Sequence, residues 1–213
     1  MGQLRAPAPL EVIVLRHGRT AANGAGVIPG QLDVALDPVG CAEAQRSARE
    51  LLKLGIGSIL TSDLARAQDT AAALGAATGL PWTSDRRLRE TYVGNWQGLT
   101  REQAQAAFPE EFRAWWAGHD VARGGGETEQ EVGRRAAAAV HECLVGARLP
   151  VVVVTHAGAA RALIGTLLGL PVEHWRRLSP LANGGWSRLG RDHLGWQLLV
   201  HNETAVHDTP VPQ

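Results

Sequence analysis

Val12-Ile13-Val14-Leu15-Arg16-His17-Gly18 is an apolar run that ends in an arginine, a histidine and a glycine. Its four apolar residues predict a buried strand, and Gly18 allows the chain to turn sharply where that strand ends. Because open α/β sheets bind ligands at the carboxyl ends of their strands, Arg16 and His17 are expected in a ligand site. An imidazole can act as a nucleophile, and a guanidinium matches the oxygens of a phosphate group. The stretch favours a phosphoryl-accepting histidine beside a phosphate-binding arginine, but alone it fits a structural histidine equally well.

A second apolar run that ends in histidine repeats this pattern late in the chain. Val151 to Val154 predict a buried strand, and Thr155-His156-Ala157-Gly158 follows it. Between the two units, Glu90 lies in a loop that is punctuated by Gly94 and Gly98. Two histidines that follow strands, together with a carboxylate in a loop, supply complementary chemistry for moving a phosphoryl group and a proton.

A segment between the two histidine motifs, which follows another predicted strand, adds a second arginine. Ile59 to Thr61 reads as a strand, and the residues after it predict a helix with Ser62 or Asp63 as its N-cap. Arg66 would lie in the first turn of that helix, close to an N-terminus that already attracts anions.

Taken together, these motifs resemble the histidine phosphatase superfamily, in its phosphoglycerate-mutase-like branch. The resemblance runs from about Val12 to about His201. Its motifs are Arg16-His17-Gly18, Gly30-Gln31-Leu32-Asp33, the segment from Ser62 to Ala71, the Glu90 loop, Gly125-Gly126-Glu127, Thr155-His156-Ala157-Gly158, and Asn183 with Trp186. The combination is far more specific than any one of these motifs.

The resemblance implies a role for each matching residue. His17 would be the nucleophile that forms a phosphohistidine, and Glu90 would give a proton to the leaving oxygen and then help to activate water. The second ring nitrogen of His17 would need a hydrogen-bond acceptor, such as a backbone carbonyl. The phosphoryl oxygens would be held by Arg16, Arg66 and His156, and further substrate contacts would come from Thr20, Asn23, Gly30 and Ala157. No metal and no cofactor is implied.

Each of these residues also has a structural interpretation. Arg66 could be a surface arginine on an amphipathic helix, and His156 could be a hydrogen-bonded core histidine. The alternative is strongest for Glu90, which could pair with Arg87 or Arg89 in this charge-rich segment.

Two reactions stay open once the histidine is phosphorylated. A mutase holds the phosphoenzyme dry and returns the phosphoryl group to the substrate, whereas a phosphatase admits water. Cofactor-dependent mutases carry a longer and more basic insertion between the glutamate and the second histidine, but only 66 positions separate Glu90 from His156 here. The resemblance therefore favours a phosphatase for a small phosphorylated metabolite, either a phosphoglycerate derivative or a sugar phosphate. A phosphoglycerate mutase is the alternative, and an inactive phospho-ligand sensor is an alternative of another class.

Among the phosphatases, the sequence is similar to the actinobacterial glucosyl-3-phosphoglycerate phosphatases. Leu88-Arg89-Glu90 and Gly94-Asn95-Trp96-Gln97-Gly98-Leu99-Thr100 carry part of this similarity. The sequence departs from the usual pattern at four positions near the expected site, namely Arg19, Ala22, Pro29 and Ala157. Arg19 or Ala22 could change which substrate the pocket accepts.

The alternation of strands and helices predicts a three-layer α/β/α fold, with a mostly parallel central sheet and a small helical cap. We expect residues 1–213 to form one domain, with mobile tails at 1–9 and 207–213 and the cap at 99–126. Within the cap, Phe112, Trp115 and Trp116 share one helix face, which favours packing between helices. Alternatively, one of the tryptophans forms a wall of the pocket, and His119 and Arg123 reach a distal anionic group.

Charge and cysteine content narrow the partners. The chain has 213 residues and a formal net charge of zero, so no overall field favours nucleic acid or an anionic membrane. Cys41 and Cys143 are expected to be free thiols in a reducing compartment, which indicates the cytoplasm. No apolar run approaches the length of a membrane span. The expected partner is a small-molecule phosphate monoester, and the family resemblance implies a homodimer.

Overall fold

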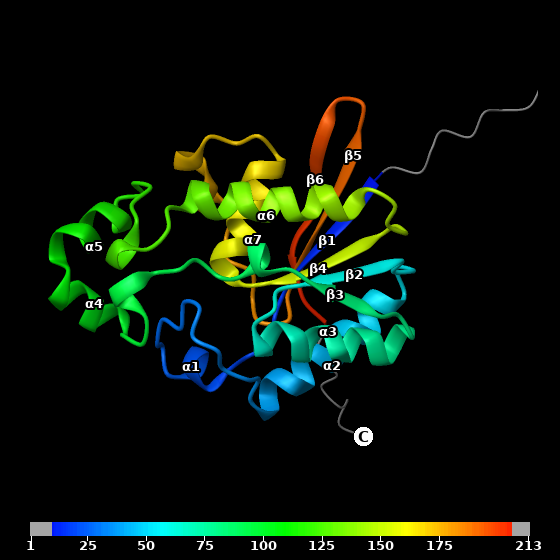
Figure 1. Ribbon diagram of the computed structural model, residues 1–213, viewed down its shortest axis with the longest axis horizontal. Helices are drawn as coiled ribbons and strands as arrows, with labels where there is room; N and C mark the ends of the chain where they lie inside the picture. Colours follow the sequence, from blue (N-terminus) through cyan, green and yellow to red (C-terminus); the bar gives the residue numbers. More distant parts are fainter. Residues whose placement is uncertain (1–9, 206–213) are drawn as a thin grey trace, which may run out of the picture.

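The computed structural model describes residues 10–205, so the tails predicted to be mobile and His207 lie outside the described residues (Figure 1). Its centre is a six-stranded sheet with the order β3-β2-β4-β1-β5-β6. The strands are β1 (Leu10–Arg16), β2 (Ser58–Thr61), β3 (Trp82–Ser84), β4 (Val151–Thr155), β5 (Trp186–Asp192) and β6 (Gly195–Glu203). The first four strands in this order pair in parallel, and the β5–β6 hairpin joins β1 antiparallel. The predicted mostly parallel sheet is confirmed.

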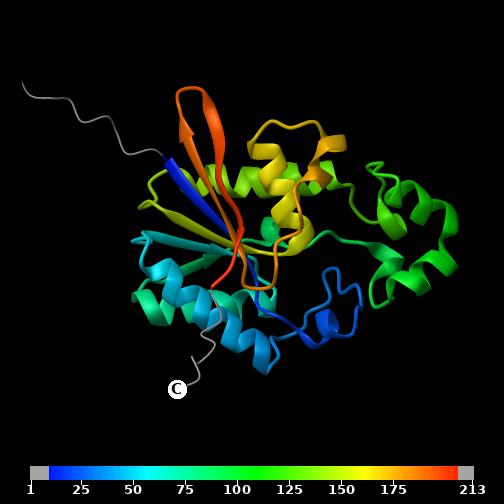
Figure 2. The same cartoon turned by 180° about the vertical axis from the view of Figure 1, so that it is seen from behind.

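Helices cover both faces of the sheet (Figures 1 and 2). On one face lie α2 (Pro38–Leu52) and α3 (Ala65–Thr78), and on the other lie α6 (Glu129–Leu144) and α7 (Ala157–Leu167). Because successive side chains of a strand point to opposite faces, β1 divides its apolar residues between the two layers. Val12 and Val14 pack with α6 and α7, whereas Ile13 and Leu15 pack with α2 and α3. This arrangement is the predicted three-layer fold.

The connections that leave β1 and β4 create a crevice at the centre of the sheet. These strands are neighbours, and Arg16 lies opposite Thr155 in their register. After β1 the chain passes to α2 on one face, whereas after β4 it passes to α7 on the other face. The chain therefore diverges at the carboxyl ends of β1 and β4, which is where open α/β sheets bind ligands.

Two short helices, α4 (Arg101–Ala107) and α5 (Pro109–Trp116), lie apart from the sheet at one side of the molecule (Figure 1). Thr100 caps α4, because its hydroxyl accepts from the Gln103 amide and the Gln103 side chain accepts from the Thr100 amide. A small core joins these helices to the Glu90 loop, with Trp96 and Phe112 stacked at 5.7 Å between ring centres.

The predicted N-cap of α3 is wrong. The helix begins at Ala65, and Leu64 precedes it without a side-chain cap. The free amide of Ala65 donates instead to Asp33 Oδ1 at 2.8 Å, and Asp63 is paired with Arg89. The cap comes from a loop remote in sequence, and local pattern does not reveal it. Five short helices were not predicted from the sequence. They are α1 (Ala21–Gly24) and the 3-10 helices η1 (Arg86–Leu88), η2 (Gly94–Trp96), η3 (Arg123–Gly125) and η4 (Val172–Arg177).

Across residues 10–205, no helix has both the length and the apolar character that crossing a membrane requires.

Candidate active site

His17 and His156 meet at the ends of β1 and β4. The amide of His17 donates to the carbonyl oxygen of Thr155 at 3.0 Å, which extends the strand pairing by one residue. The centres of the two imidazole rings lie 5.1 Å apart, and both side chains are buried. The register of the sheet therefore brings together the two histidines that the sequence singled out.

Hydrogen bonding fixes which nitrogen of His17 is available for chemistry. Nδ1 lies 2.6 Å from the carbonyl oxygen of Gly18. Because a carbonyl oxygen only accepts, Nδ1 carries the proton and the lone pair is on Nε2. Burial, and then the charges of Arg66 and Arg16, hold the pKa of His17 well below its ordinary value of 6.5. The imidazole is therefore neutral, and its Nε2 is unprotonated. The predicted backbone acceptor is confirmed.

Arg66 determines the tautomer of His156. Its Nε donates to His156 Nδ1 at 3.1 Å, so the proton of the imidazole is on Nε2. That Nε2 is buried and has no partner within the described residues. The pKa of His156 is held well below 6.5, first by burial and then by Arg66 and His17. His156 thus presents an unused N–H donor from a neutral ring, and the alternative of a fully satisfied core histidine is wrong.

Arg66 is fully buried, which excludes the surface alternative. Its Nη1 and Nη2 donate to the carbonyl oxygens of Leu32 and Gly30, both at 2.8 Å. Arg16 donates from Nη1 to the carbonyl oxygen of Leu181 at 2.7 Å, and its buried Nε has no partner within residues 10–205. Burial lowers the pKa of both arginines from its ordinary value, but a guanidinium stays charged in proteins. Two cations therefore lie beside two neutral imidazoles.

Gly18 is required for close packing. A Cβ at this position would collide with the carbonyl oxygen of Gly40, in the first turn of α2. A Cβ on Gly40 would in turn collide with the carbonyl oxygen of Arg19. The two glycines let the backbone after His17 lie directly against α2, a reason that the sequence alone did not provide.

Glu90 is seated at the N-terminus of α7. Its carboxylate accepts from the amides of Gly158 and Ala159, at 3.0 and 2.9 Å, and from the amide of Thr91 at 2.8 Å. A helix N-terminus stabilises negative charge through its free amides and its dipole. The carboxylate is therefore fixed beside Ala157, the residue that directly follows His156.

The structural alternative for Glu90 is wrong, because the neighbouring arginines have other partners. Arg87 pairs with Asp85 at 2.6 Å and with Glu142 at 2.7 Å. Arg89 pairs with Asp63 at 2.7 Å. The carboxylate of Glu90 is thereby left for the site.

Arg135 holds the loop that carries Glu90, and sequence reasoning missed it. From α6, its guanidinium donates to the carbonyl oxygens of Arg87, Arg89 and Glu90, at 2.6, 2.7 and 3.0 Å. It also pairs with Glu127, at 2.7 Å from Nε to Oε1. Nothing local in the sequence distinguishes this arginine from a solvated helix residue.

The expected substrate contacts divide into two groups. Gly30 and Ala157 line a cavity beside Glu90, and Gly30 has a positive φ of 52°. Thr20 and Asn23 cap α1 together, since Asn23 Oδ1 accepts from the amide and hydroxyl of Thr20 at 3.1 and 3.0 Å. Asn183 bridges to the site by donating to the carbonyl oxygen of His17 at 3.2 Å and to Asn23 Oδ1 at 3.3 Å.

The cavity beside Glu90 has a volume of about 200 Å³. Its wall includes Trp115 and Arg123 from the segment expected to form a cap, and Arg161 from α7. Phe112 is buried against Trp96, as the packing interpretation of this helix predicts, whereas Trp116 is 64% exposed. Trp115 matches the other alternative, a tryptophan in the pocket wall.

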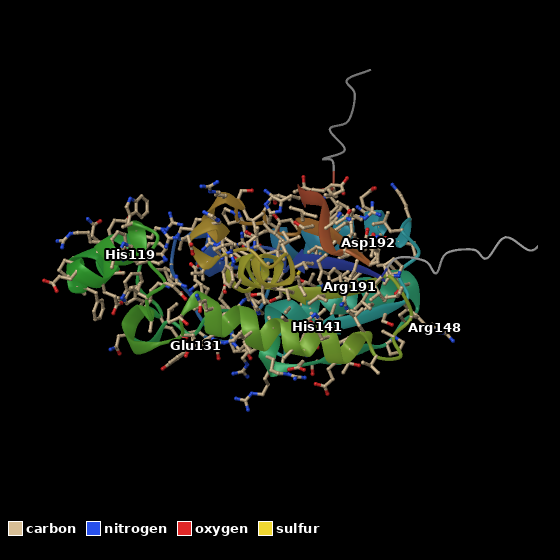
Figure 3. All side chains as sticks on the ribbon, turned by 90° about the horizontal axis from the view of Figure 1, so that it is seen from above. His119, Glu131, His141, Arg148, Arg191 and Asp192 are labelled. Carbon is tan, nitrogen blue, oxygen red and sulfur yellow. The ribbon has the colours of Figure 1, made fainter. Side chains whose placement is uncertain are left out.

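The remaining described histidines lie elsewhere. His119 and His141 are exposed on the surface, His119 near the far end of the α4–α5 helices (Figure 3). His193 is exposed, His174 is half-buried, and His201 is hydrogen-bonded to Ser179 and Ser187. Within residues 10–205, no group of three or more His, Cys, Asp or Glu side chains could hold a metal ion.

Comparison with known proteins relates this geometry to one family. Residues 12–204 match the family described as "Histidine phosphatase superfamily (branch 1)". A glucosyl-3-phosphoglycerate phosphatase from Mycolicibacterium vanbaalenii is 40% identical, over 91% of this chain and 95% of that protein. A Yersinia enterocolitica protein, "Probable phosphoglycerate mutase GpmB", is 36% identical, over 94% of this chain and 96% of that protein. The structure of a mycobacterial glucosyl-3-phosphoglycerate phosphatase with VO3 has a TM-score of 0.85 and 38% identity, covering 92% of this chain and 100% of that one.

Proposed function

The chain belongs to the histidine phosphatase superfamily and is a phosphatase, and we propose that it hydrolyses a phosphoglycerate derivative through a phosphohistidine on His17. The observation that carries the proposal is the hydrogen bond from His17 Nδ1 to the carbonyl oxygen of Gly18. It leaves the Nε2 lone pair free beside two arginines and an unused N–H donor of His156. The relatives named glucosyl-3-phosphoglycerate phosphatase support that compound as the first substrate to test.

In the first step, Nε2 of His17 attacks phosphorus and the bond from phosphorus to the ester oxygen breaks. Protonated Glu90 gives its proton to the leaving oxygen. Arg16, Arg66 and His156 hold the phosphoryl oxygens, where fixed positive charge and N–H donors stabilise the charge of the transition state. The first product is the alcohol, and the phosphoryl group stays on His17.

In the second step, a water molecule attacks phosphorus and the bond to Nε2 of His17 breaks. The Glu90 carboxylate takes a proton from that water, which restores both residues. Inorganic phosphate leaves. The position of Glu90 on α7 supports this role, because the amides of Gly158 and Ala159 hold its carboxylate at the N-terminus of the helix that follows His156.

A phosphoglycerate mutase is the second candidate, and the relative from Yersinia enterocolitica favours it. The same first step would be followed by return of the phosphoryl group to a second oxygen of the substrate. The short interval between Glu90 and His156 supports hydrolysis instead.

Three further properties belong to the same proposal. The enzyme needs no metal, because His17, Glu90 and the arginines supply the whole of the chemistry. It works in the cytoplasm, which the free thiols of Cys41 and Cys143 support. It acts as a homodimer on a small phosphate monoester, as the family resemblance implies.

The direct test is phosphate release from a panel of phosphate monoesters, with EDTA present. The panel holds glucosyl-3-phosphoglycerate, both phosphoglycerates, sugar phosphates and ribazole phosphate. We expect His17→Ala to lower release at least about a thousandfold, because the nucleophile is lost. His193→Ala, an exposed histidine, is the matched control and should release phosphate like the wild type. Interconversion of the phosphoglycerates without release would identify a mutase, and no turnover by the wild type would favour a sensor.

A further inference from the structure

The cavity beside Glu90 contains a cluster of cations that the phosphoryl chemistry does not use. Arg123 and Arg161 line it together with Trp115. The guanidinium of Arg123 lies over the Trp115 ring, 5.4 Å from its centre, and Arg176 from η4 lies over the same ring at 5.0 Å. We name Trp115, Arg123, Arg161 and Arg176 the arginine cluster.

The arginine cluster holds buried N–H donors with nothing to donate to. Among residues 10–205, seven buried side-chain atoms have no hydrogen-bond partner. Four of them belong to this cluster, namely Trp115 Nε1, Arg123 Nε, Arg161 Nε and Arg176 Nη2. Proteins seldom leave buried donors unpaired, and those that occur are explained by strain, a catalytic role, or a bound water or ion. The donors therefore point to a missing acceptor.

Charge identifies the acceptor as an anion. Arg161 pairs with Glu129 at 3.0 Å, whereas Arg123 and Arg176 make no ion pair within the described residues. Burial lowers the pKa of Arg123 from its ordinary value. Glu129 and Glu90 oppose that shift, and Arg161 and Arg176 add to it. An added anion would relieve the repulsion between these guanidinium groups.

The position of Arg123 relative to Glu90 is fixed by glycines. Gly124 packs against the loop after Glu90 so closely that a Cβ on it would contact the Val93 carbonyl oxygen, at 2.5 Å. The next residues are tied to that loop in both directions, since Glu127 N donates to Tyr92 O at 2.7 Å and Tyr92 N donates to Glu127 Oε2 at 2.8 Å. The separation between the arginine cluster and the reacting phosphate is thus built into the fold.

We infer that the arginine cluster binds a carboxylate of the substrate while the ester phosphate lies at His17, and that Arg123 determines this specificity. The inference rests on the proposed function and adds the substrate class, a phosphate monoester with a second anionic group at a set distance. A phosphate monoester without a second anionic group would leave the donors of the cluster unpaired.

The experiment compares two esters that differ in the carboxylate, 3-phosphoglycerate and glycerol 3-phosphate. For the wild type we expect a larger kcat/KM with 3-phosphoglycerate. In Arg123→Met the ratio of the two kcat/KM values should fall about tenfold or more, because one charged contact to the carboxylate is lost. Arg113→Met is the matched control, since Arg113 is an exposed arginine on α5, and it should keep the wild-type ratio.

Two further measurements keep the outcomes distinct. Arg176→Met removes a charge of the cluster from another element and should lower the ratio too, so a folding defect of one variant does not decide the result. Calorimetric binding of both esters to His17→Ala and to the double variant with Arg123→Met tests the site without turnover, because both proteins lack the nucleophile.

An unchanged ratio in both variants, with a wild type that hydrolyses both esters, would overturn the inference and leave the proposed function standing. A wild type that releases phosphate from no ester of the panel, yet binds 3-phosphoglycerate more tightly than glycerol 3-phosphate through Arg123, would contradict the proposed function alone. If the variants lose only the preference for glucosyl-3-phosphoglycerate over 3-phosphoglycerate, the cluster binds the sugar and the carboxylate assignment is wrong.

Discussion

At the scale of single residues, the site depends on keeping two imidazoles neutral inside the protein. His17 and His156 are both buried, and the positive charge of Arg66 lowers the pKa of each. Their Nδ1 atoms have different partners, a carbonyl acceptor for His17 and a guanidinium donor for His156. One ring therefore offers a lone pair and the other offers an N–H, which is the pair of functions that phosphoryl transfer to nitrogen requires.

The neutral state of His156 makes stability depend on pH. Its folded pKa lies well below 6.5, whereas the unfolded chain has the ordinary value. Below about pH 6.5 the unfolded state therefore binds a proton that the folded state does not, and the free energy of unfolding falls as pH falls. The contribution of this histidine is at most about 1.4 kcal/mol per pH unit. Urea denaturation between about pH 5 and 7 should give a shallower pH slope for His156→Gln than for the wild type.

His193→Gln is the control for that slope, because His193 is exposed. It should keep the steep pH dependence of the wild type. Equal slopes in His156→Gln and the wild type would show that His156 is protonated in the folded protein.

Single residues were predictable where they follow a strand. His17, His156 and Glu90 were found from sequence because apolar runs and glycines mark the strand ends and the loop. Arg135 was not found, since its three carbonyl partners are more than 40 positions away in the chain. The expected contact from His119 to a distal anion is not supported, since His119 is exposed on the surface (Figure 3).

At the scale of elements, α6 and α7 position Glu90 from two sides. α7 receives the carboxylate of Glu90 at its N-terminus, and α6 grips the backbone around Glu90 through Arg135. The sequence patterns of α6 and α7 do not reveal that they position Glu90, because both patterns indicate only amphipathic helices that cover a sheet.

Arg135→Met should misplace Glu90 while His17 stays in position. We expect kcat for an alkyl phosphate to fall about tenfold to a hundredfold with KM nearly unchanged, because protonation of the leaving oxygen is impaired. With p-nitrophenyl phosphate, whose leaving group needs little protonation, the loss should be much smaller. Arg134→Met removes the exposed neighbour on the same helix and should behave like the wild type. A loss of equal size with both substrates would mean that Arg135 acts only on the fold.

Element boundaries were predictable where the cap is local and not where it is tertiary. Asp37 caps α2 and Thr100 caps α4 through local hydrogen bonds, because each accepts from an amide three positions later. α3 takes its acceptor from Asp33 in a remote loop, so the prediction of Ser62 or Asp63 was wrong.

At the scale of the whole molecule, the divergence of the chain after β1 and β4 explains where the site lies. The sequence predicted the layers and the parallel sheet because strands and helices alternate along it. It could not predict that Trp115, Arg123, Arg161 and Arg176 converge, because they come from α5, η3, α7 and η4. The residues of the site can thus be predicted from sequence motifs, whereas the arginine cluster, which is proposed to select the substrate, is recognised only in the three-dimensional structure.

In the proposed reaction the phosphoryl group passes through His17. The most direct test of this step is to mix enzyme and substrate, quench in alkali within one turnover, and locate phosphate on the chain by mass spectrometric fragmentation. We expect one phosphoryl group on His17 of the wild type and none on the chain of His17→Ala. A wild type that turns over with no phosphorylated enzyme, or with the phosphoryl group on another residue, would contradict the account.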